Sequence, residues 1–296
     1  MLELVIDRRQ RDLGGFAVGR VLPFAKRRMV GPFILLDHLG PVDLPAGLSP
    51  SADVRPHPHI GLSTLTYLFE GEIMHRDSVG SEQAIRPGEV NWMTAGRGIT
   101  HSERFEKARA VGDCIHAIQS WVALPDADEE CAPAFAHHSA DSLPIDRADG
   151  VWARLLAGKA FGASATVNMH SPLFYAHCEL AAGKSMNLPA EYSERAAYIV
   201  QGEVAVDGRR LTAGQMPVFA PGPARIAAAA DSTLMLLGGE PVGQRFIEWN
   251  FVASSQKRLE RAKADWRAGR MKLPDRDNRE FIPLPEWPVA PPRPMS

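Results

Sequence analysis

The stretch TYLFEGEIMHRDSVGSEQAIRPGEVNWMTAG, residues 66–96, alternates apolar and polar side chains between glycine turns. Such alternation is typical of half-buried β-strands that are joined as hairpins. A second stretch, AYIVQGEVAVDGRRLTAGQMPVFAPG at residues 197–222, follows the same plan, and its YIVQGE aligns with YLFEGE in the first. This internal repeat predicts two β domains of similar construction.

The length and the turn residues of the chain support the same conclusion. A chain of 296 residues has room for two domains of roughly 150 residues each. Its 25 glycines and 24 prolines are spread along the sequence, which favours short strands over long helices. We expect a first domain at 1–132, a linker rich in Asp, Ala and Pro at 133–145, and a second domain at 146–296.

One short helix is expected near the carboxyl end. In SSQKRLERAKADWRAGR, residues 254–270, Leu259, Ala262 and Trp266 fall on one helical face, and a serine precedes them as a helix cap. Six prolines at 281–296 predict an extended tail along the surface of the domain.

Charge and cysteine content exclude several classes of protein. Lys and Arg number 33 against 35 Asp and Glu, so no excess charge favours direct binding to nucleic acid or to an anionic membrane. Three cysteines without a CxxC pair exclude a disulfide framework and a thiolate zinc site. No stretch approaches the ~18 apolar residues of a membrane span, and no signal peptide is visible. We expect a cytoplasmic protein.

The segment RPHPH, residues 55–59, gives the clearest indication of chemistry. Each proline disfavours helical backbone in the residue before it, so the segment is expected to be a strand. Residues two apart on a strand face the same side, which brings His57 and His59 together. Because Pro58 cannot donate a ladder hydrogen bond, this strand should lie at a sheet edge or contain a bulge.

A second pair of this kind lies in TAGRGITHSERF, residues 94–105. His101 and Glu103 are again two apart, and they share a face only if the segment is a strand. Three imidazoles and one carboxylate form a nitrogen and oxygen donor set that suits Fe²⁺, and also manganese, cobalt, nickel, copper or zinc. We therefore predict one divalent ion per chain, held by His57, His59, His101 and Glu103.

These motifs resemble the pirin family of the cupin superfamily. The matching stretches are GPFILLDHLGP (31–41), HPHIGLSTLTYLFEGEIMHRDSVG (57–80) and PGEVNWMTAGRGITHSE (87–103), with a weaker match in EFIPLP (280–285). The resemblance implies an all-β protein of two cupin (jelly-roll) β-barrel domains packed together, with a short C-terminal helix and an extended tail. It also implies one iron in the first domain, on the four residues named above.

The chain departs from the commonest pirin pattern, HPHRGFET, at three positions beside the site. Ile60 replaces an arginine, Leu62 a phenylalanine and Ser63 a glutamate. None of the three is an expected ligand, so the metal prediction is unaffected. The changes lie next to the site, where they bear on the choice of substrate and partner.

The second domain carries no metal signature of its own. Aligning the two repeats at Gly71 and Gly202 places Leu188 and Ala190 where the first domain has its HxH pair. Neither side chain can ligate a metal, so we expect a scaffold domain.

The resemblance implies one of two functions. The first is an iron-dependent dioxygenase that uses O₂ on a small aromatic enol such as a flavonol, of the quercetin 2,3-dioxygenase type. Glu103 would then be the catalytic base, and Phe33 and Trp92 would bind the substrate, although core packing is equally typical of Phe33 and more usual for Trp92. The alternative is a non-enzymatic iron- or redox-sensing regulator that binds a protein partner, either a transcription factor or a metabolic enzyme.

The remaining histidines that we considered are expected to be structural or solvated. His75 is predicted to be a partly exposed strand residue, with a fifth ligand or a donor behind the ligands as alternatives. His137 and His138 fall in the predicted linker and should be solvated. His170 and His177 have no matched partner in the sequence.

Overall fold

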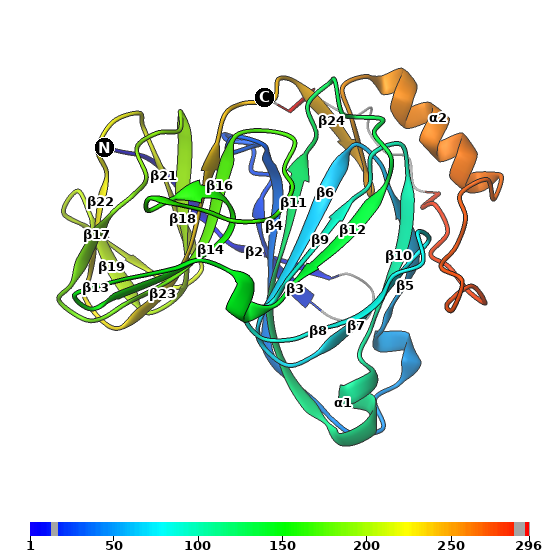
Figure 1. Cartoon of the computed structure of the whole chain (residues 1–296), viewed down its shortest axis with the longest axis horizontal. Helices are drawn as coiled ribbons and strands as arrows, with labels where there is room; N and C mark the ends of the chain where they lie inside the picture. The colour runs from blue at the N-terminus through cyan, green and yellow to red at the C-terminus, as the bar shows by residue number, and fades with distance from the viewer. Residues whose placement is uncertain (13–16, 287–293, 296) are drawn as a thin grey trace. The chain divides into compact units, whose positions relative to one another are not determined.

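The computed structural model describes residues 1–12, 17–286 and 294–295. The chain is built mostly from antiparallel β-strands, as predicted, and Figure 1 shows their course. It divides into two compact units. The 35–140 unit comprises Arg11–Val18, Leu35–Ala140 and Gly243–Ser296, and the 141–242 unit comprises Met1–Gln10, Gly19–Ile34 and Asp141–Val242.

Two sheets form the body of the 35–140 unit. One runs β12-β9-β6-β11-β4 and the other β5-β10-β7-β8. Apolar side chains from both sheets, among them Leu68 and Ile115 on one and Ile73 and Ile85 on the other, share one buried core. The strands are β4 (Phe33–Leu44), β5 (Val54–His59), β6 (Leu62–Glu70), β7 (Ile73–Asp77), β8 (Glu82–Ile85), β9 (Val90–Thr94), β10 (Ile99–Arg104), β11 (Asp113–Ala123) and β12 (Ala134–His138), with a helical turn η1 (Pro50–Ala52) and a short helix α1 (Glu106–Val111).

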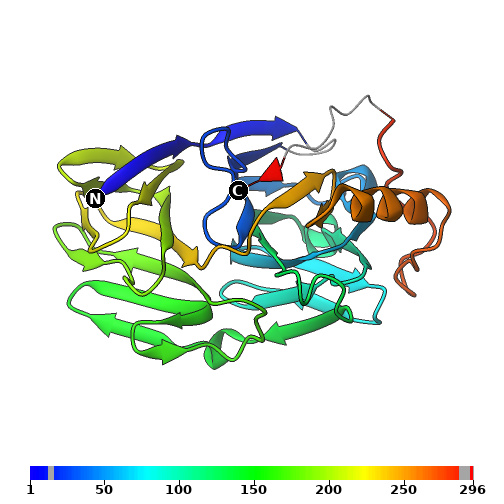
Figure 2. The ribbon, with the colours of Figure 1, turned by 90° about the horizontal axis from the view of Figure 1, so that it is seen from above.

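The carboxyl-terminal residues add a helix and a small sheet to this unit. Helix α2 (Gln256–Arg267) buries Leu259, Ala262 and Trp266, the face predicted from the sequence, against Phe251 and its neighbours. Figure 2 shows α2 (orange). The small sheet runs in the order β25 (Phe251–Ala253), β24 (Arg245–Glu248) and β26 (Pro294–Met295).

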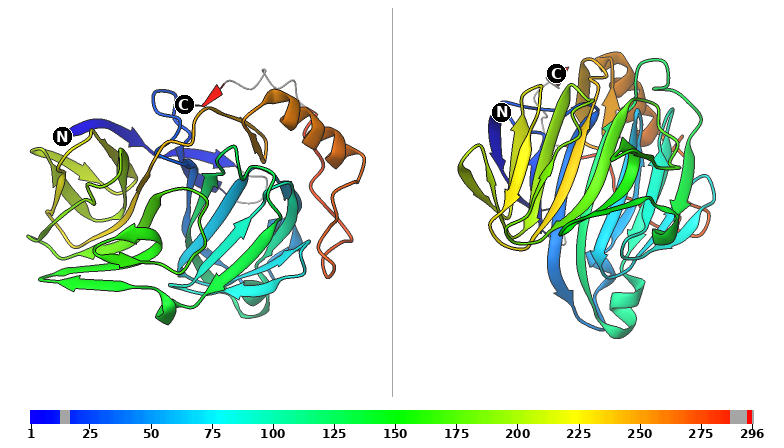
Figure 3. Two further views of the ribbon diagram at one scale, coloured as in Figure 1. Left: turned by 45° about the horizontal axis from the view of Figure 1, so that its top comes forward. Right: turned by 60° about the vertical axis from the view of Figure 1, so that its left-hand side comes forward.

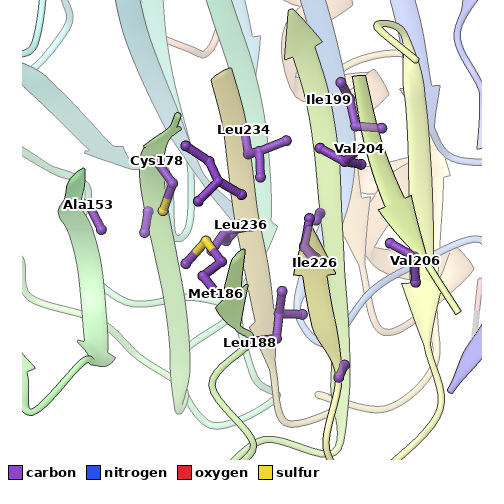
Figure 4. Close-up of a cluster of buried hydrophobic side chains, with 14 of the residues drawn as sticks. Ala153, Cys178, Met186, Leu188, Ile199, Val204, Val206, Ile226, Leu234 and Leu236 are labelled. Atoms are coloured by element: carbon purple, nitrogen blue, oxygen red, sulfur yellow. The ribbon is translucent and has the colours of Figure 1, made fainter. Parts of the chain in front are cut away.

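The 141–242 unit also consists of two antiparallel sheets. The larger runs β1-β21-β18-β23-β16-β14-β13, with β15 paired to β14, and its green to yellow strands lie side by side in Figure 3. The smaller runs β17-β22-β19-β20, and an apolar cluster joins both sheets (Figure 4). The strands are β1 (Leu2–Asp7), β13 (Ile145–Ala148), β14 (Val151–Ala160), β15 (Ala163–Ser164), β16 (Leu173–Leu180), β17 (Ser185–Asn187), β18 (Glu194–Gln201), β19 (Glu203–Val206), β20 (Arg209–Thr212), β21 (Gln215–Phe219), β22 (Arg225–Ala228) and β23 (Ser232–Gly239).

Four elements are split between the two units, because a unit boundary falls inside each of them. They are β2 (Arg9–Asp12), β3 (Ala17–Leu22), β4 and the turn η2 (Ala140–Ser142). No helix within the described residues has the length and apolar character that crossing a membrane requires.

The units differ from the predicted division at both chain ends. Met1–Gln10 belongs to the 141–242 unit because β1 pairs with β21. Gly243–Ser296 belongs to the 35–140 unit, where α2 packs on Ile60 and Phe251. Part of the predicted linker is a strand, because β12 pairs with β9 through five residues, from Ala134 to His138. The predicted tail at 281–296 falls partly outside the described residues.

Candidate metal centre

Strands β5 and β10 bring the predicted histidines together. They pair antiparallel, with His101 opposite His57, so the strand prediction is confirmed for both segments. Strand β5 is the edge of its sheet, as the missing donor of Pro58 requires. The pairing of β10 with β5 also shifts register between His101 and Glu103. Such an irregularity was the alternative to an edge position that the sequence analysis expected for β5.

The three imidazoles form one buried cluster. The ring centroids of His57 and His101 are 4.4 Å apart, and each is 5.0 Å from the ring of His59. The three residues are only 6, 1 and 1% exposed for His57, His59 and His101. One ligand nitrogen from each lies within 4.8 Å of the other two, and within the described ranges this is the one group of three His, Cys, Asp or Glu side chains so arranged.

Hydrogen bonds at the Nδ1 atoms leave the Nε2 atoms available. His57 Nδ1 lies 2.9 Å from the Arg55 carbonyl oxygen, and His59 Nδ1 lies 3.1 Å from that of Asn250. A carbonyl only accepts, so both Nδ1 atoms carry the ring proton and both Nε2 atoms keep their lone pair. The Nε2 atoms of His59 and His101 are 3.2 Å apart. Two nitrogens at that separation, each about 2.1 Å from a shared ion, subtend about 100°, which suits metal coordination.

Burial keeps these rings neutral. It lowers the pKa of His57 to about 4, and it lowers the pKa values of His59 and His101 well below their ordinary value, with neighbouring imidazoles adding to the effect. Neutral imidazole is the form that binds metals. Three neutral nitrogens that converge in a buried place therefore fit a divalent ion.

Glu103 follows His101 on β10, but its carboxylate is not part of the group of three. Burial raises the pKa of Glu103 to about 7, and a hydrogen bond with the Thr66 side chain partly offsets that rise. The Thr66 hydroxyl also lies 2.6 Å from Gln119 Oε1. The role of Glu103 as a fourth ligand stays a prediction, and its carboxyl exchanges a proton near neutral pH.

The facing sheet contributes polar side chains that the sequence analysis missed. Thr66 on β6 pairs with Gln119 on β11 and with Asn91 on β9, so the three side chains share one face of the sheet, the face that meets Glu103. Asn91 is 3% exposed and its Oδ1 accepts from His137, while its Nδ2 has no partner. The available signal was the presence of Thr64 and Thr66, two residues apart, inside the otherwise mostly apolar run LSTLTYLFE.

An aromatic ring of the same sheet packs on the cluster. Trp121 lies two residues beyond Gln119 on β11, and its ring meets that of His59 edge to face at 5.0 Å. The contact holds the imidazole of His59 in place and excludes water from it.

The two predicted substrate-binding residues are both buried. Phe33 belongs to the 141–242 unit, where it is fully buried with its ring 5.3 Å from that of Tyr175. Trp92 is 4% exposed, and side-chain alternation along β9 turns it away from the face of Asn91. Contact of Phe33 and Trp92 with a substrate stays a prediction.

His75 is buried, which corrects its predicted exposure. It is 3% exposed because β7 lies inside its sheet and the ring of Phe135 stacks on it at 4.5 Å. Its Nδ1 lies 3.3 Å from His101 Nδ1, and its Nε2 lies 2.9 Å from Asp77 Oδ2. Burial acts to raise the pKa of Asp77, but hydrogen bonds from His75 and Ser81 bring it below its usual value.

The other histidines have structural surroundings. His137 and His138 are half-buried on β12 rather than solvated, because this segment is a sheet strand. His177 is 8% exposed and lies 2.7 Å from the carboxylate of Glu179. His170 is half-buried.

The positions in the second repeat that match the HxH pair are apolar in the structure as well. Leu188 is 3% exposed inside the apolar cluster drawn in Figure 4, and Ala190 is exposed. Its surroundings give Leu188 a packing role.

Two antiparallel two-sheet units, one of which encloses converging histidines, define a two-domain cupin protein. A family model described as Pirin matches residues 15–122, and a second, described as Pirin C-terminal cupin domain, matches residues 175–272. The chain belongs to the pirin family, which confirms the resemblance and the fold class.

Relatives match over nearly the whole chain. A pirin-like protein of Caulobacter vibrioides is 64% identical, over 97% of this chain and 100% of the relative. A Pseudomonas aeruginosa protein that carries the provisional name quercetin 2,3-dioxygenase is 37% identical, over 91% and 84%. The crystal structure of a quercetin 2,3-dioxygenase from Acinetobacter baumannii superposes with a TM-score of 0.88 at 34% identity, over 99% and 98% of the two chains.

Proposed function

We propose that this pirin is a metal-dependent dioxygenase that acts on an aromatic enol of the flavonol class, with Fe²⁺ as its metal. The observation that supports it is the set of three buried, neutral imidazoles, each of which has a ligand nitrogen within 4.8 Å of the other two. Three nitrogens and one carboxylate hold a divalent ion and leave coordination positions open. The relatives from A. baumannii and P. aeruginosa that are named as quercetin 2,3-dioxygenases support the substrate class.

In this proposal His57, His59 and His101 hold one ion per chain, and Glu103 is the fourth ligand. The bound ion would supply Lewis acidity toward an oxygen of the substrate, which favours its deprotonated form. The donor set by itself also accommodates manganese, cobalt, nickel, copper or zinc.

Glu103 has the properties of a proton acceptor. With a pKa of about 7 it is available in both protonation states at neutral pH, which is the range that a general base requires. The side chain of Thr66 holds the carboxyl in place. Asn91 offers a buried Nδ2 donor without a partner, and this donor suits an acceptor oxygen of an oxygen-rich substrate.

The test is oxygen consumption by the Fe²⁺-loaded protein in the presence of quercetin, measured with an oxygen electrode and by loss of the quercetin absorbance. We expect uptake of O₂ in proportion to the quercetin consumed. His57→Ala should abolish uptake, whereas the matched control His177→Ala, a buried histidine beside a carboxylate in the other unit, should retain it. A fully loaded protein that consumes no oxygen with quercetin or related flavonols would contradict the proposal and favour the regulatory alternative.

A further inference from the structure

The three candidate ligands differ in what holds their Nδ1 atoms. His57 and His59 each meet a backbone carbonyl, which can only accept and therefore fixes the ring tautomer. His101 instead meets another imidazole, with its Nδ1 3.3 Å from His75 Nδ1. An imidazole nitrogen can donate or accept, so this contact leaves the tautomer of His101 open until the other side of His75 is considered.

Asp77 determines which of the two nitrogens, His75 Nδ1 or His101 Nδ1, is the donor. Its Oδ2 lies 2.9 Å from His75 Nε2, and its Oδ1 accepts from the backbone N–H groups of Val79 and Ser81, each at 3.0 Å. A carboxylate only accepts, so His75 Nε2 carries the proton. A ring whose single proton is on Nε2 accepts at Nδ1, and in that form of His75 the donor of the contact is His101 Nδ1. His101 Nε2 keeps its lone pair, directed toward His59 Nε2.

We propose that Asp77 and His75 are a positioning pair that fixes the tautomer and the orientation of His101 for metal binding. Asp77, His75 and His101 are 1, 3 and 1% exposed, so water cannot substitute for either partner. The ring of Phe135, stacked on His75, restricts its rotation. The inference rests on the metal site of the proposed function, though not on its substrate or its oxygen chemistry.

Asp77→Asn tests the pair with little change of shape. The two backbone N–H groups of Val79 and Ser81 hold the carbonyl oxygen of the new amide, which leaves its NH₂ group facing His75. That amide donates to His75 Nε2, His75 Nδ1 becomes the donor, and the proton of His101 moves to Nε2, where it blocks the metal. We expect Co²⁺ affinity, measured by competition with a chelator, to fall by roughly 10–100-fold, the range typical of partners behind metal ligands. Unchanged affinity would overturn the inference.

A double-mutant cycle shows whether Asp77 acts through the ring. In the His75→Gln background the side-chain oxygen of glutamine can accept directly from His101, so Asp77→Asn should add little further loss of Co²⁺ affinity. Two fully additive losses would contradict the pair. Glu179→Gln is the matched control, because Glu179 lies two residues from His177 on β16 and 2.7 Å from its Nε2. That variant should bind Co²⁺ as the wild type does, and a comparable loss there would overturn the specific role of Asp77.

The tautomers can also be read without any variant, metal or substrate. In the metal-free full chain, ¹⁵N imidazole shifts at pH 7 should place the proton of His101 on Nδ1 and that of His75 on Nε2. In Asp77→Asn both should exchange. A wild-type His101 protonated on Nε2, or a doubly protonated His75, would refute the inference whether or not the protein oxidises a flavonol.

Discussion

The Nε2 atoms of His59 and His101 lie 3.2 Å apart, and in the tautomers set by their neighbours neither carries a proton. Two lone pairs at this distance repel unless a cation lies between them. Without metal, this repulsion therefore destabilises the folded state. An ion that binds only the folded chain stabilises the folded state by mass action.

Removal of one imidazole should abolish metal binding and leave the fold in place. In His57→Ala only two nitrogens of the group of three remain, while the core of the 35–140 unit does not involve this residue. Elemental analysis of the purified variant should find a metal content near zero, with a near-UV circular dichroism spectrum like that of the wild type. The control His177→Ala should keep its metal. Unchanged metal content in His57→Ala would show that the ligand set is wrong.

Metal stoichiometry tests the scaffold role of the second domain. Because Leu188 is packed in an apolar cluster and Ala190 has no donor atom, the saturated protein should hold about one ion per chain, the number that a single nitrogen and oxygen site accommodates. Titration with Co²⁺, followed by its visible absorbance and by elemental analysis, measures this number. A value near two would mean that a second site exists.

The local pattern of the sequence determines its strands well. The prolines of RPHPH predicted strand β5 and, as one of two alternatives, its edge position. The metal hypothesis required a strand at His101 and Glu103, and β10 lies there, but its pairing with β5 is seen only in the structure. The pairing of strands that lie far apart in the sequence could not be predicted in this way. Strand β1 pairs with β21, about two hundred residues away, and alternation shows that a strand has a buried face without showing which strand covers it.

The same limit explains the errors around the site. His75 was expected to be partly exposed because its segment has an alternating pattern, but Phe135 covers it from β12, a segment whose composition is typical of a linker. Thr66 and Asn91 meet the site from strands of the facing sheet, and only the pairing of β6 with β9 aligns them. Candidate ligands two residues apart are visible in the sequence, whereas the partners of His59, His101 and Glu103 lie in other segments of the chain.

The metal-free protein should lose stability as pH falls from about 6.5 toward 4. The folded-state pKa values of His57, His59 and His101 lie below those of the unfolded chain, so the unfolded state takes up three protons in this window while the native state stays neutral. Glu103 acts in the opposite sense, since its raised pKa favours the native state at low pH and this contribution is lost as pH rises toward 7.

Three histidines outweigh one carboxyl, so the site as a whole opposes folding in acid. Two net protons correspond to a slope of about 3 kcal/mol per pH unit at most. Urea unfolding of metal-free protein between pH 4.5 and 7 measures the slope, and comparison with His57→Ala removes the contribution of all other groups. The variant should show a slope that is smaller by about one proton. Equal slopes would mean that His57 is not buried as a neutral ring.

The last prediction separates the two roles of Glu103. If the carboxylate binds the ion, it must first lose its proton, so the metal affinity of the wild type should fall about tenfold per pH unit below about 7. The histidines do not contribute near pH 6, because their lowered pKa values keep them neutral there. Glu103→Gln should bind metal more weakly at pH 8 and should lose this pH dependence.

Oxygen uptake with saturating Fe²⁺ then tests whether Glu103 also acts as a general base. At full occupancy a defect of roughly 10²–10⁴ in the rate of Glu103→Gln is what loss of a general base produces. We expect both effects together, weaker binding and a remaining defect at saturation, because one group holds the ion and accepts the proton. Full activity at saturating iron would leave Glu103 as a ligand alone. A binding curve with the same pH dependence as the wild type would remove it from the ligand set.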